Sequence, residues 1–332
     1  MKAIIPVAGA GTKLRPLTYT QPKALIPLAG KTILGVIIEQ LADAGVDEFV
    51  FVIGYLGEKI QRYIDKNYPH LKHTYVQQND RRGTGHAIWL TRDVVKDDEV
   101  MIVLGDTVCD YNVKEVLASN VSQIGVRKVD DPRSFGVAEL NDFDMVVRMV
   151  EKPLIPKSNM AMVGIYYIKE TASMYANLSK HLSNTADENG EYHLTSALQH
   201  MVEDGINIHA FRVNTWFDCG KKETLLSTNA TLLRQMESSQ PGKFNYSFDN
   251  TVIIHPVNIA EGCNIRNSII GPNVTIGEHT KIDSSIVKDS IIGSFAELQQ
   301  VVLNSSIIGS DAFIRGLSQS LNIGDNTEID LG

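Results

Sequence analysis

The chain has 332 residues, of which 43% are hydrophobic and 21% charged. This composition is typical of soluble globular proteins and leaves room for one large and one small domain. The formal net charge of −8 argues against a nucleic-acid partner, because proteins that bind DNA or RNA usually present a basic surface.

Cysteine use and hydropathy exclude several further classes. The three cysteines, Cys109, Cys219 and Cys263, are scattered along the chain, which predicts neither a disulfide framework nor a structural zinc site. No run approaches the roughly eighteen apolar residues that a membrane span requires. We therefore expect a cytoplasmic protein without a membrane partner.

Apolar strands alternate with amphipathic helical stretches over the larger, N-terminal part of the chain. Residues 3–7 predict a strand, 32–44 a helix, 48–53 a strand and 57–68 a helix, and the segments 72–77, 86–94 and 99–104 continue the alternation. This order favours an α/β fold over residues 1–234, with a doubly wound, mostly parallel sheet. Because such sheets bind ligands at the carboxyl ends of their strands, the loops after Val7 and Leu104 are candidate sites.

After about Phe248 the helical period gives way to a repeat of aliphatic residues. Three sets of positions advance by 16 residues: Ile254, Ile270, Ile286 and Val302; Ile276, Ile292 and Ile308; Ile282, Leu298 and Ile314. This spacing predicts a triangular β-solenoid over residues 248–332, and it resembles the left-handed β-helix of hexapeptide-repeat proteins. The polar stretch 235–247 is the expected linker.

A glycine-rich loop follows the first predicted strand. Gly9 and Gly11 allow backbone N–H groups to approach a polyphosphate closely, and Lys13, Arg15 and Lys23 add positive charge around them. A Gly-x-Gly pair by itself is more typical of a tight βα turn with solvent-facing cations. The segment matches neither a Walker loop nor a full dinucleotide-binding loop.

Acidic residues stand at the ends of other apolar segments. Asp106 ends the strand at 99–104, and Asp218 lies in a loop near the end of the α/β region. Magnesium prefers one or two carboxylates together with phosphate oxygens and water, so this pair would suit it. Each aspartate alone could equally be a helix N-cap or a turn residue. Glu151-Lys152 alone is more typical of a surface pair.

The order and spacing of these segments resemble the nucleotidylyltransferase family over about residues 1–230, and within it glucose-1-phosphate thymidylyltransferases. The matching motifs are Gly9-Ala10-Gly11-Thr12-Lys13-Leu14-Arg15-Pro16-Leu17-Thr18, Pro22-Lys23-Ala24-Leu25, Phe135-Gly136-Val137-Ala138-Glu139, Glu151-Lys152-Pro153, Glu191-Tyr192-His193-Leu194-Thr195 and Trp216-x-Asp218-x-Gly220.

The resemblance implies a role for each matching residue. Ala8, Gly9, Gly11, Thr12 and Lys13 would hold the nucleotide phosphates, Lys23 would reach the reacting phosphates, and Gln78 and Gly83 would read the pyrimidine edge. Asp106 and Asp218 would ligate Mg²⁺, with Lys13, Lys23 and Asp106 as the catalytic residues. Gly136, Glu151 and Gly164 would contact the sugar, Lys152 its phosphate, and Trp216 would line the sugar pocket. The implied reaction joins an NTP and a sugar 1-phosphate into an NDP-sugar, with release of pyrophosphate.

Two departures leave the nucleotide base open between dTTP and UTP. Lys13 stands where the family usually has arginine, and it keeps the charge but loses the planar fork for bidentate phosphate contact. The loop is also one residue shorter than the usual one, and together with Gly83-Thr84-Gly85-His86-Ala87 it is more like that of uridylyltransferases. The sugar is expected to be glucose 1-phosphate, with mannose-1-phosphate guanylyl transfer as an alternative.

Three further expectations concern the role of the solenoid, the presence of catalytic activity and the role of the histidines. The solenoid is expected to mediate homo-oligomerisation, although an acyltransferase site, and so a bifunctional enzyme, is an alternative. A non-catalytic nucleotide-sugar sensor is disfavoured by the presence of Lys23, Glu151-Lys152 and both aspartates. His86 and His193 are expected to be structural, because no serine or cysteine nucleophile lies in an elbow motif near them.

Overall fold

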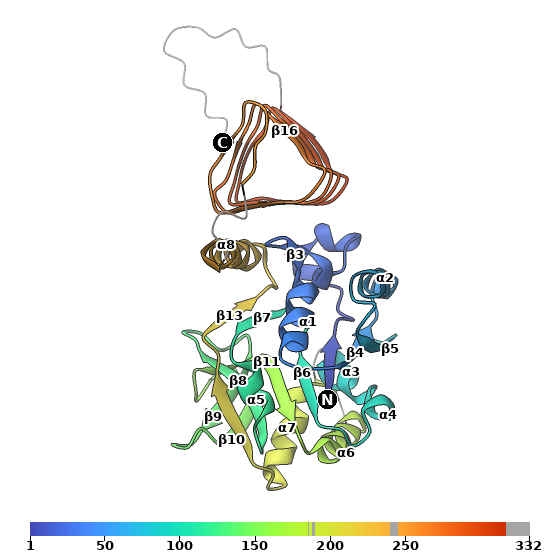
Figure 1. Ribbon diagram of the computed structural model, residues 1–332. Helices are drawn as coiled ribbons and strands as arrows, with labels where there is room; N and C mark the ends of the chain where they lie inside the picture. Colours follow the sequence, from blue (N-terminus) through green and yellow to red (C-terminus); the bar gives the residue numbers. More distant parts are fainter. Residues whose placement is uncertain (185, 188–189, 240–244, 317–332) are drawn as a thin grey trace. The chain divides into compact units, whose positions relative to one another are not determined.

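The computed structural model describes residues 1–184, 186–187, 190–239 and 245–316. The chain divides into two compact units after Thr228, and Figure 1 shows their elements. Helix α8 (Lys222–Ser239) crosses this division, so residues 235–239 of the predicted linker are helical. Residues 240–244 of that linker and 317–332 of the predicted solenoid lie outside the described residues.

The first unit contains a mixed sheet whose centre is parallel. Its parallel strands follow the order β6-β1-β4-β5. Their bounds are β1 (Lys2–Pro6), β4 (Glu48–Ile53), β5 (Lys72–Gln77) and β6 (Val100–Val103). The helices that follow β1, β4 and β5 in the chain are α1 (Ile33–Asp43), α2 (Gly57–Asn67), α3 (Gly83–Trp89) and α4 (Arg92–Val95). The strand and helix predictions for this half agree closely with the structure, except that the segment 86–94 falls in two helices.

The remaining strands turn the sheet antiparallel beyond β6. Strand β11 pairs antiparallel with β6, β8 and β9, β10 pairs antiparallel with β9, and β12 runs parallel to β8. Their bounds are β8 (Ser122–Lys128), β9 (Gly136–Leu140), β10 (Val146–Glu151), β11 (Met160–Ile168) and β12 (Ile208–Arg212). The structure therefore confirms an α/β fold with a Rossmann-like, mostly parallel centre and adds an antiparallel half.

Several short elements complete the first unit. They are η1 (Thr12–Leu14), η2 (Leu17–Tyr19), η3 (Lys23–Leu25), β2 (Pro27–Leu28), β3 (Lys31–Thr32), β7 (Thr107–Asp110), α5 (Val113–Leu117) and β13 (Thr215–Asp218). Strands β7 and β13 form an antiparallel pair apart from the main sheet, with Asp218 opposite Thr107.

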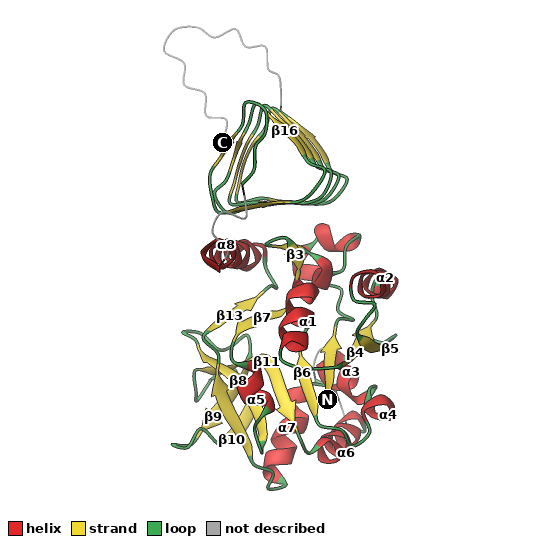
Figure 2. Cartoon of the chain, in the orientation of Figure 1, coloured by secondary structure: helices red, strands yellow, loops and turns green. Residues whose placement is uncertain are grey.

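Apolar side chains on both faces of the sheet bury it between helices, which are red in Figure 2. On one face, Ile4, Val50 and Ile102 pack with residues of α3, α6 (Thr171–Leu182) and α7 (Leu194–Glu203). The strand residues that alternate with them, such as Ile5 and Phe51, are fully buried and face the other side, where α1 lies (Figure 1). A sheet covered on both faces leaves the carboxyl ends of its strands as the accessible edge.

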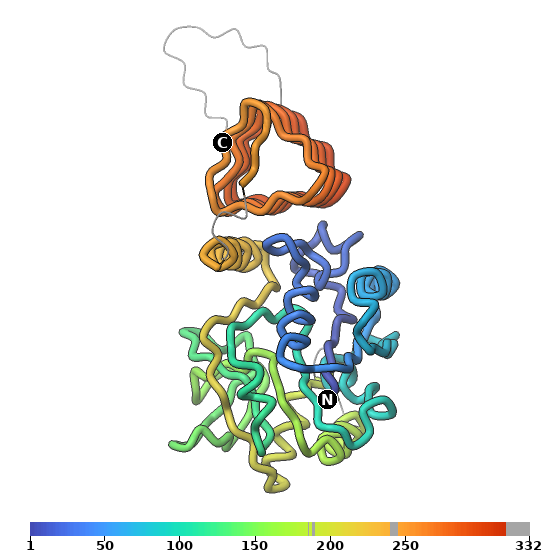
Figure 3. Tube along the Cα trace, in the orientation of Figure 1, coloured from blue at the N-terminus to red at the C-terminus, as the bar shows by residue number. Residues whose placement is uncertain are grey.

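The second unit contains a parallel β-helix, and its coils stack as triangles in Figure 3. Its three parallel ladders are β14-β17-β20-β23, β15-β18-β21-β24 and β16-β19-β22-β25. The strands are β14 (Val252–Ile253), β15 (Val257–Ile259), β16 (Asn264–Arg266), β17 (Ile269–Ile270), β18 (Val274–Ile276), β19 (Lys281–Asp283), β20 (Ile286–Lys288), β21 (Ile291–Ile292), β22 (Glu297–Gln299), β23 (Val302–Asn304), β24 (Ile307–Ile308) and β25 (Phe313–Arg315). This arrangement fits the predicted left-handed β-helix.

One of the three predicted repeat sets is wrong. Ile270 pairs with Ile253 and Val287, and Val287 pairs with Leu303, so the spacings are 270 − 253 = 17, 287 − 270 = 17 and 303 − 287 = 16. Of the predicted set Ile254, Ile270, Ile286 and Val302, only Ile270 is buried. The segment from Ile270 to Ile276 is one residue longer than its counterpart from Val287 to Ile292, and a shift of one residue reverses the face of a strand. The other two sets are confirmed by the pairing.

No helix in the described part of the chain is long and apolar enough to cross a membrane.

Candidate active site

A cavity of about 760 Å³ opens at the carboxyl ends of β1 and β6, within the range of small-molecule sites. Every residue to which the family resemblance assigned a role lines it: Ala8, Gly9, Gly11, Thr12, Lys13, Lys23, Gln78, Gly83, Asp106, Gly136, Glu151, Lys152, Gly164, Trp216 and Asp218. Arg15, the third cation expected around the glycine loop, is not among the lining residues. The fold therefore brings together residues from eight separate stretches of the sequence, while the role of each remains a prediction.

The glycine loop packs directly against Lys23. Gly11 has a φ of +59°, and a Cβ built on it would lie 3.0 Å from Cβ of Lys23 and 3.1 Å from Cγ2 of Thr18. The Thr18 hydroxyl donates to the carbonyl oxygen of Gly11 at 2.8 Å. Glycine suits this position because it adopts positive φ without steric cost and leaves room for the lysine stem. A Cβ on Gly9, in contrast, would meet no atom within 4 Å.

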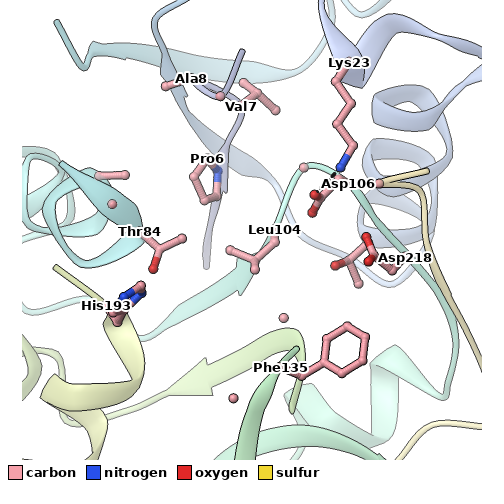
Figure 4. Close-up of a pocket in the computed structure, with 18 of the residues that line it drawn as sticks. Pro6, Val7, Ala8, Lys23, Thr84, Leu104, Asp106, Phe135, His193 and Asp218 are labelled. Carbon is pink, nitrogen blue, oxygen red and sulfur yellow. Dashed lines mark hydrogen bonds and ion pairs between the residues drawn. The ribbon is translucent and has the colours of Figure 1, made fainter. Parts of the chain in front are cut away.

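Lys23 and the two aspartates form a charged cluster on one side of the cavity, as Figure 4 shows. Lys23 Nζ lies 2.5 Å from Oδ2 of Asp106. The β7–β13 pairing brings Asp218 to the same place, and the N–H of Cys219 donates to the carbonyl oxygen of Asp106 at 3.1 Å. Burial and the charge of Asp106 raise the pKa of Asp218, against the smaller opposite effect of Lys23 and Lys13.

The donor set of this cluster fits a divalent cation. Asp106 and Asp218 offer carboxylate oxygens, which magnesium prefers, beside a loop suited to phosphates. Burial first, and then the charge of Asp106, raise the pKa of Asp218, so keeping its carboxylate ionised at this place costs free energy,. A bound cation would offset that cost.

Glu151 and Lys152 lie at another part of the cavity. Thr195 donates its hydroxyl hydrogen to Oε2 of Glu151 at 2.6 Å, and a Cβ on Gly136 would lie 3.0 Å from the same oxygen. The other oxygen, Oε1, is 3.8 Å from Lys152 Nζ and 3.9 Å from His193 Nδ1. Both distances exceed hydrogen-bond length, so Thr195 anchors Glu151 through Oε2, while Oε1 lies at ion-pair distance from Lys152.

Gln78 is held by residues of the first turn of α3. Its Nε2 donates to the carbonyl oxygen of Gly83 and lies 3.2 Å from Nδ1 of His86. Gly83 has a φ of +89°, and a Cβ on it would lie 2.6 Å from the carbonyl oxygen of Tyr192. Burial lowers the pKa of His86, and the charge of Arg82 adds to this effect. A neutral imidazole can accept the Gln78 hydrogen at Nδ1.

Aromatic and glycine contacts shape the rest of the cavity. The rings of Phe135 and Trp216 meet edge to face, with their centroids 4.7 Å apart. Gly164 has a φ of +84°, and a Cβ on it would lie 2.8 Å from Cδ1 of Leu104. Gly164 therefore occupies a position where a side chain would collide with Leu104.

Several lining residues received no role from the sequence. They are Arg81, Thr84, Phe135, Glu191, His193 and Thr195. Several of them belong to motifs that can be recognised in the sequence, but only the folded chain shows that Thr195 contacts Glu151. His193, expected to be structural, does have a structural partner, since its Nε2 lies 2.8 Å from Oδ2 of Asp187. It also lines the cavity, opposite the Lys23 cluster in Figure 4.

Comparison with known proteins agrees with this geometry. Residues 2–235 match the nucleotidyl transferase family. The glucose-1-phosphate thymidylyltransferase of Streptomyces antibioticus is 31% identical over 310 residues, which cover 90% of this chain and 82% of that protein. The bifunctional protein GlmU of Methanocaldococcus jannaschii is 36% identical over 266 residues, covering 79% of this chain and 61% of that protein.

A solved structure supports the fold independently. The structure of UDP-glucose pyrophosphorylase complexed with UDP-glucose has a TM-score of 0.62 and 23% identity, covering 70% of this chain and 98% of that one. The chain belongs to the nucleotidyl transferase family, and it is a transferase of that class.

Proposed function

We propose that the protein is a sugar-1-phosphate nucleotidylyltransferase that converts an NTP and a sugar 1-phosphate into an NDP-sugar and pyrophosphate. The substrates proposed are glucose 1-phosphate with dTTP or UTP, and two relatives carry names of this kind. The observation that carries the proposal is the Lys23–Asp106–Asp218 cluster beside the glycine loop, in one cavity with Glu151-Lys152.

The reaction needs alignment and charge neutralisation more than proton transfer. A sugar phosphate is already anionic near neutral pH, because the second phosphate pKa is about 6, so no general base is required. Two polyanions repel each other unless cations hold them in line. Lys13 and Lys23, which both line the cavity with Gly11, would stabilise the charge that builds on the leaving pyrophosphate.

Asp106 and Asp218 would hold Mg²⁺, which when bound supplies positive charge to the reacting phosphates. This assignment rests on the pairing of β7 with β13, which holds the two carboxylates together at the edge of the phosphate loop. Preorganised charge of this kind is effective because it needs no reorganisation during the reaction.

The sugar would lie between Glu151 and the aromatic pair of Phe135 and Trp216. Oε1 of Glu151, which accepts no hydrogen bond from Lys152 or His193 at 3.8 and 3.9 Å, would accept a hydrogen from a sugar hydroxyl, and Lys152 would pair with the sugar phosphate. Gln78 and Gly83 would face the base, at the opposite end from Trp216. The predicted homo-oligomer, with the β-helix as its contact, stays a prediction.

Pyrophosphate release from the purified chain tests the proposal. Four NTPs and dTTP would be crossed with glucose, mannose, galactose and N-acetylglucosamine 1-phosphates, with Mg²⁺ and with excess chelator. We expect magnesium-dependent release that requires both substrates, fastest with glucose 1-phosphate and dTTP or UTP. Absence of pyrophosphate release from every pair of substrates would contradict the proposal. Highest activity with GTP and mannose 1-phosphate would keep the proposed reaction but change its proposed substrates to these two.

A further inference from the structure

The backbone of Tyr192 fastens the start of α3 from behind the cavity. Its N–H donates to the carbonyl oxygen of Arg82 at 2.8 Å, and its carbonyl oxygen accepts from the N–H of Gly85 at 2.7 Å. The packing is close, because a Cβ added to Gly83 or to Gly85 would lie 2.6 Å or 2.9 Å from that carbonyl oxygen. Tyr192 is itself buried and is not among the described residues that line the cavity. Any effect of Tyr192 on a ligand therefore passes through the segment that it holds.

The side chain of Tyr192 is fixed by three further contacts. Arg82 places its guanidinium over the ring, with Cζ 4.8 Å from the centroid, and donates from Nη2 to the hydroxyl oxygen at 3.1 Å. The hydroxyl donates its hydrogen to the carbonyl oxygen of Asn184 at 3.1 Å. The ring of His181 meets the tyrosine edge to face, with the centroids 5.4 Å apart. The hydroxyl thus acts as donor and acceptor at once.

The segment that Tyr192 holds also positions the glutamine expected to face the base. Nε2 of Gln78 donates to the carbonyl oxygen of Gly83 at 3.2 Å, and Gly83 directly follows Arg82 in the chain. A displacement of Arg82 therefore moves the acceptor that orients Gln78. Small movements matter at such a contact, because a hydrogen bond weakens steeply as its geometry departs from the preferred angle.

We propose that Arg82 and Tyr192 act together as positioning residues for the base of the nucleotide, by holding Gly83 where its carbonyl oxygen orients Gln78. This inference rests on the proposed sugar-nucleotide activity and deepens it. Neither Arg82 nor Tyr192 is among the described residues that line the cavity. Their substitution therefore alters the placement of Gln78 and leaves the lining of the cavity in place.

Tyr192→Phe removes the hydroxyl and keeps the ring. We expect KM for the NTP to rise about three- to tenfold, since a partly exposed hydrogen bond to a charged group contributes a factor of this order. The preference for dTTP or UTP over ATP, measured as a ratio of kcat/KM values, should fall with it. KM for the sugar 1-phosphate should stay near its original value, because Thr195 holds Glu151 separately. An unchanged KM for the NTP with an unchanged base preference would overturn the inference, as would equal rises in KM for both substrates.

Tyr175→Phe is the matched control for the loss of a buried tyrosine hydroxyl. Tyr175 lies in α6, is buried to a similar extent and shares a 2.8 Å hydrogen bond with the hydroxyl of Thr91. It is not among the described residues that line the cavity. We expect this variant to have a lower melting temperature and an unchanged base preference. A loss of base preference as large as that of Tyr192→Phe would point to general loosening of the fold and overturn the inference.

A double-mutant cycle isolates the contact between the two side chains. Arg82→Ala should raise KM for the NTP, and Tyr192→Phe should then have a smaller effect than in the natural protein, because the hydrogen bond is already absent. Any long-range attraction between the Arg82 charge and the nucleotide cancels in this comparison. Effects of the two substitutions that simply multiply would overturn the pairing of Arg82 with Tyr192.

Calorimetric titration with UTP or dTTP in the presence of Mg²⁺ separates this inference from the proposed function. Absence of turnover by the natural chain would overturn the proposed function alone. Weaker nucleotide binding by Tyr192→Phe than by the natural chain would still support the positioning role, and equal binding by the two proteins would overturn it.

Discussion

Lys23 Nζ lies 2.5 Å from a carboxylate oxygen of Asp106, although 83 positions separate the two residues in the chain. Gly11 touches the stem of the same lysine, and the backbone of Asp106 accepts a hydrogen from Cys219, the residue after Asp218. The glycine loop, Lys23 and Asp106 are therefore neighbours, and Asp218 is joined to Asp106 through the backbone of Cys219.

Replacing Lys23 or Asp106 by alanine should lower kcat by on the order of 100-fold or more, because each substitution removes a preorganised charge from the reacting phosphates. Steady-state pyrophosphate release by folded protein measures the effect. Lys31→Ala is the control, since Lys31 forms an exposed ion pair with Glu39 and should change kcat little. Near-normal turnover of both active-site variants would contradict the assigned roles.

Gly11→Ala should impair both stability and catalysis, whereas Gly9→Ala should be close to neutral. An added Cβ at Gly11 is strained by the positive φ, at roughly 1–2 kcal/mol, and presses on Lys23 at 3.0 Å. The same atom at Gly9 enters open space. Thermal unfolding and kcat of the two variants would be compared. Equal melting temperatures and equal kcat values for Gly11→Ala and Gly9→Ala would show that the close approach of Gly11 to Lys23 is unimportant.

The sequence is sufficient to predict those parts of the structure that a local pattern of residues determines. The parallel strands, the helices between them and the glycine loop are set by periodicity and short motifs within a few residues. The site also depends on the pairing of Asp218 with Thr107, between two four-residue strands far apart in the chain. Neither strand has a pattern that specifies its partner, so only the family resemblance, and no local pattern, predicted that the two aspartates lie together. The contact of Thr195 with Glu151 was hidden for the same reason.

Thr195→Val should raise KM for the sugar 1-phosphate by about tenfold and leave KM for the NTP near its original value. The substitution removes the 2.6 Å hydrogen bond that anchors Glu151, and a buried bond to a charged group is worth roughly 1.5–3 kcal/mol. Thr195→Ser, which keeps the hydroxyl, is the matched control. A similar rise in KM for both substrates would indicate a general distortion of the cavity.

Protonation of His86 should weaken nucleotide binding as the pH falls below 6.5 and through the lowered pKa of this histidine. Burial holds its pKa below the usual value of about 6.5,, so its contribution to stability is present above pH 6.5 and is lost as the pH falls through the lowered pKa. The imidazolium can no longer accept the Gln78 hydrogen at Nδ1,. KM for the NTP measured against pH should rise in the natural protein and stay flatter in His86→Gln. Parallel profiles for the two proteins would exclude His86 as the cause.

Val287→Ala should destabilise the β-helix by about 2 kcal/mol, whereas Ile286→Ala should cost less than about 0.5 kcal/mol. The two residues are adjacent in β20, but Val287 is fully buried and Ile286 is 43% exposed. A strict repeat of 16 residues predicts the reverse, because it places Ile286 inside. Urea unfolding followed by circular dichroism would compare the variants, and the transition of the β-helix is the one that should shift. A larger loss in Ile286→Ala would restore the strict repeat and contradict the register described here.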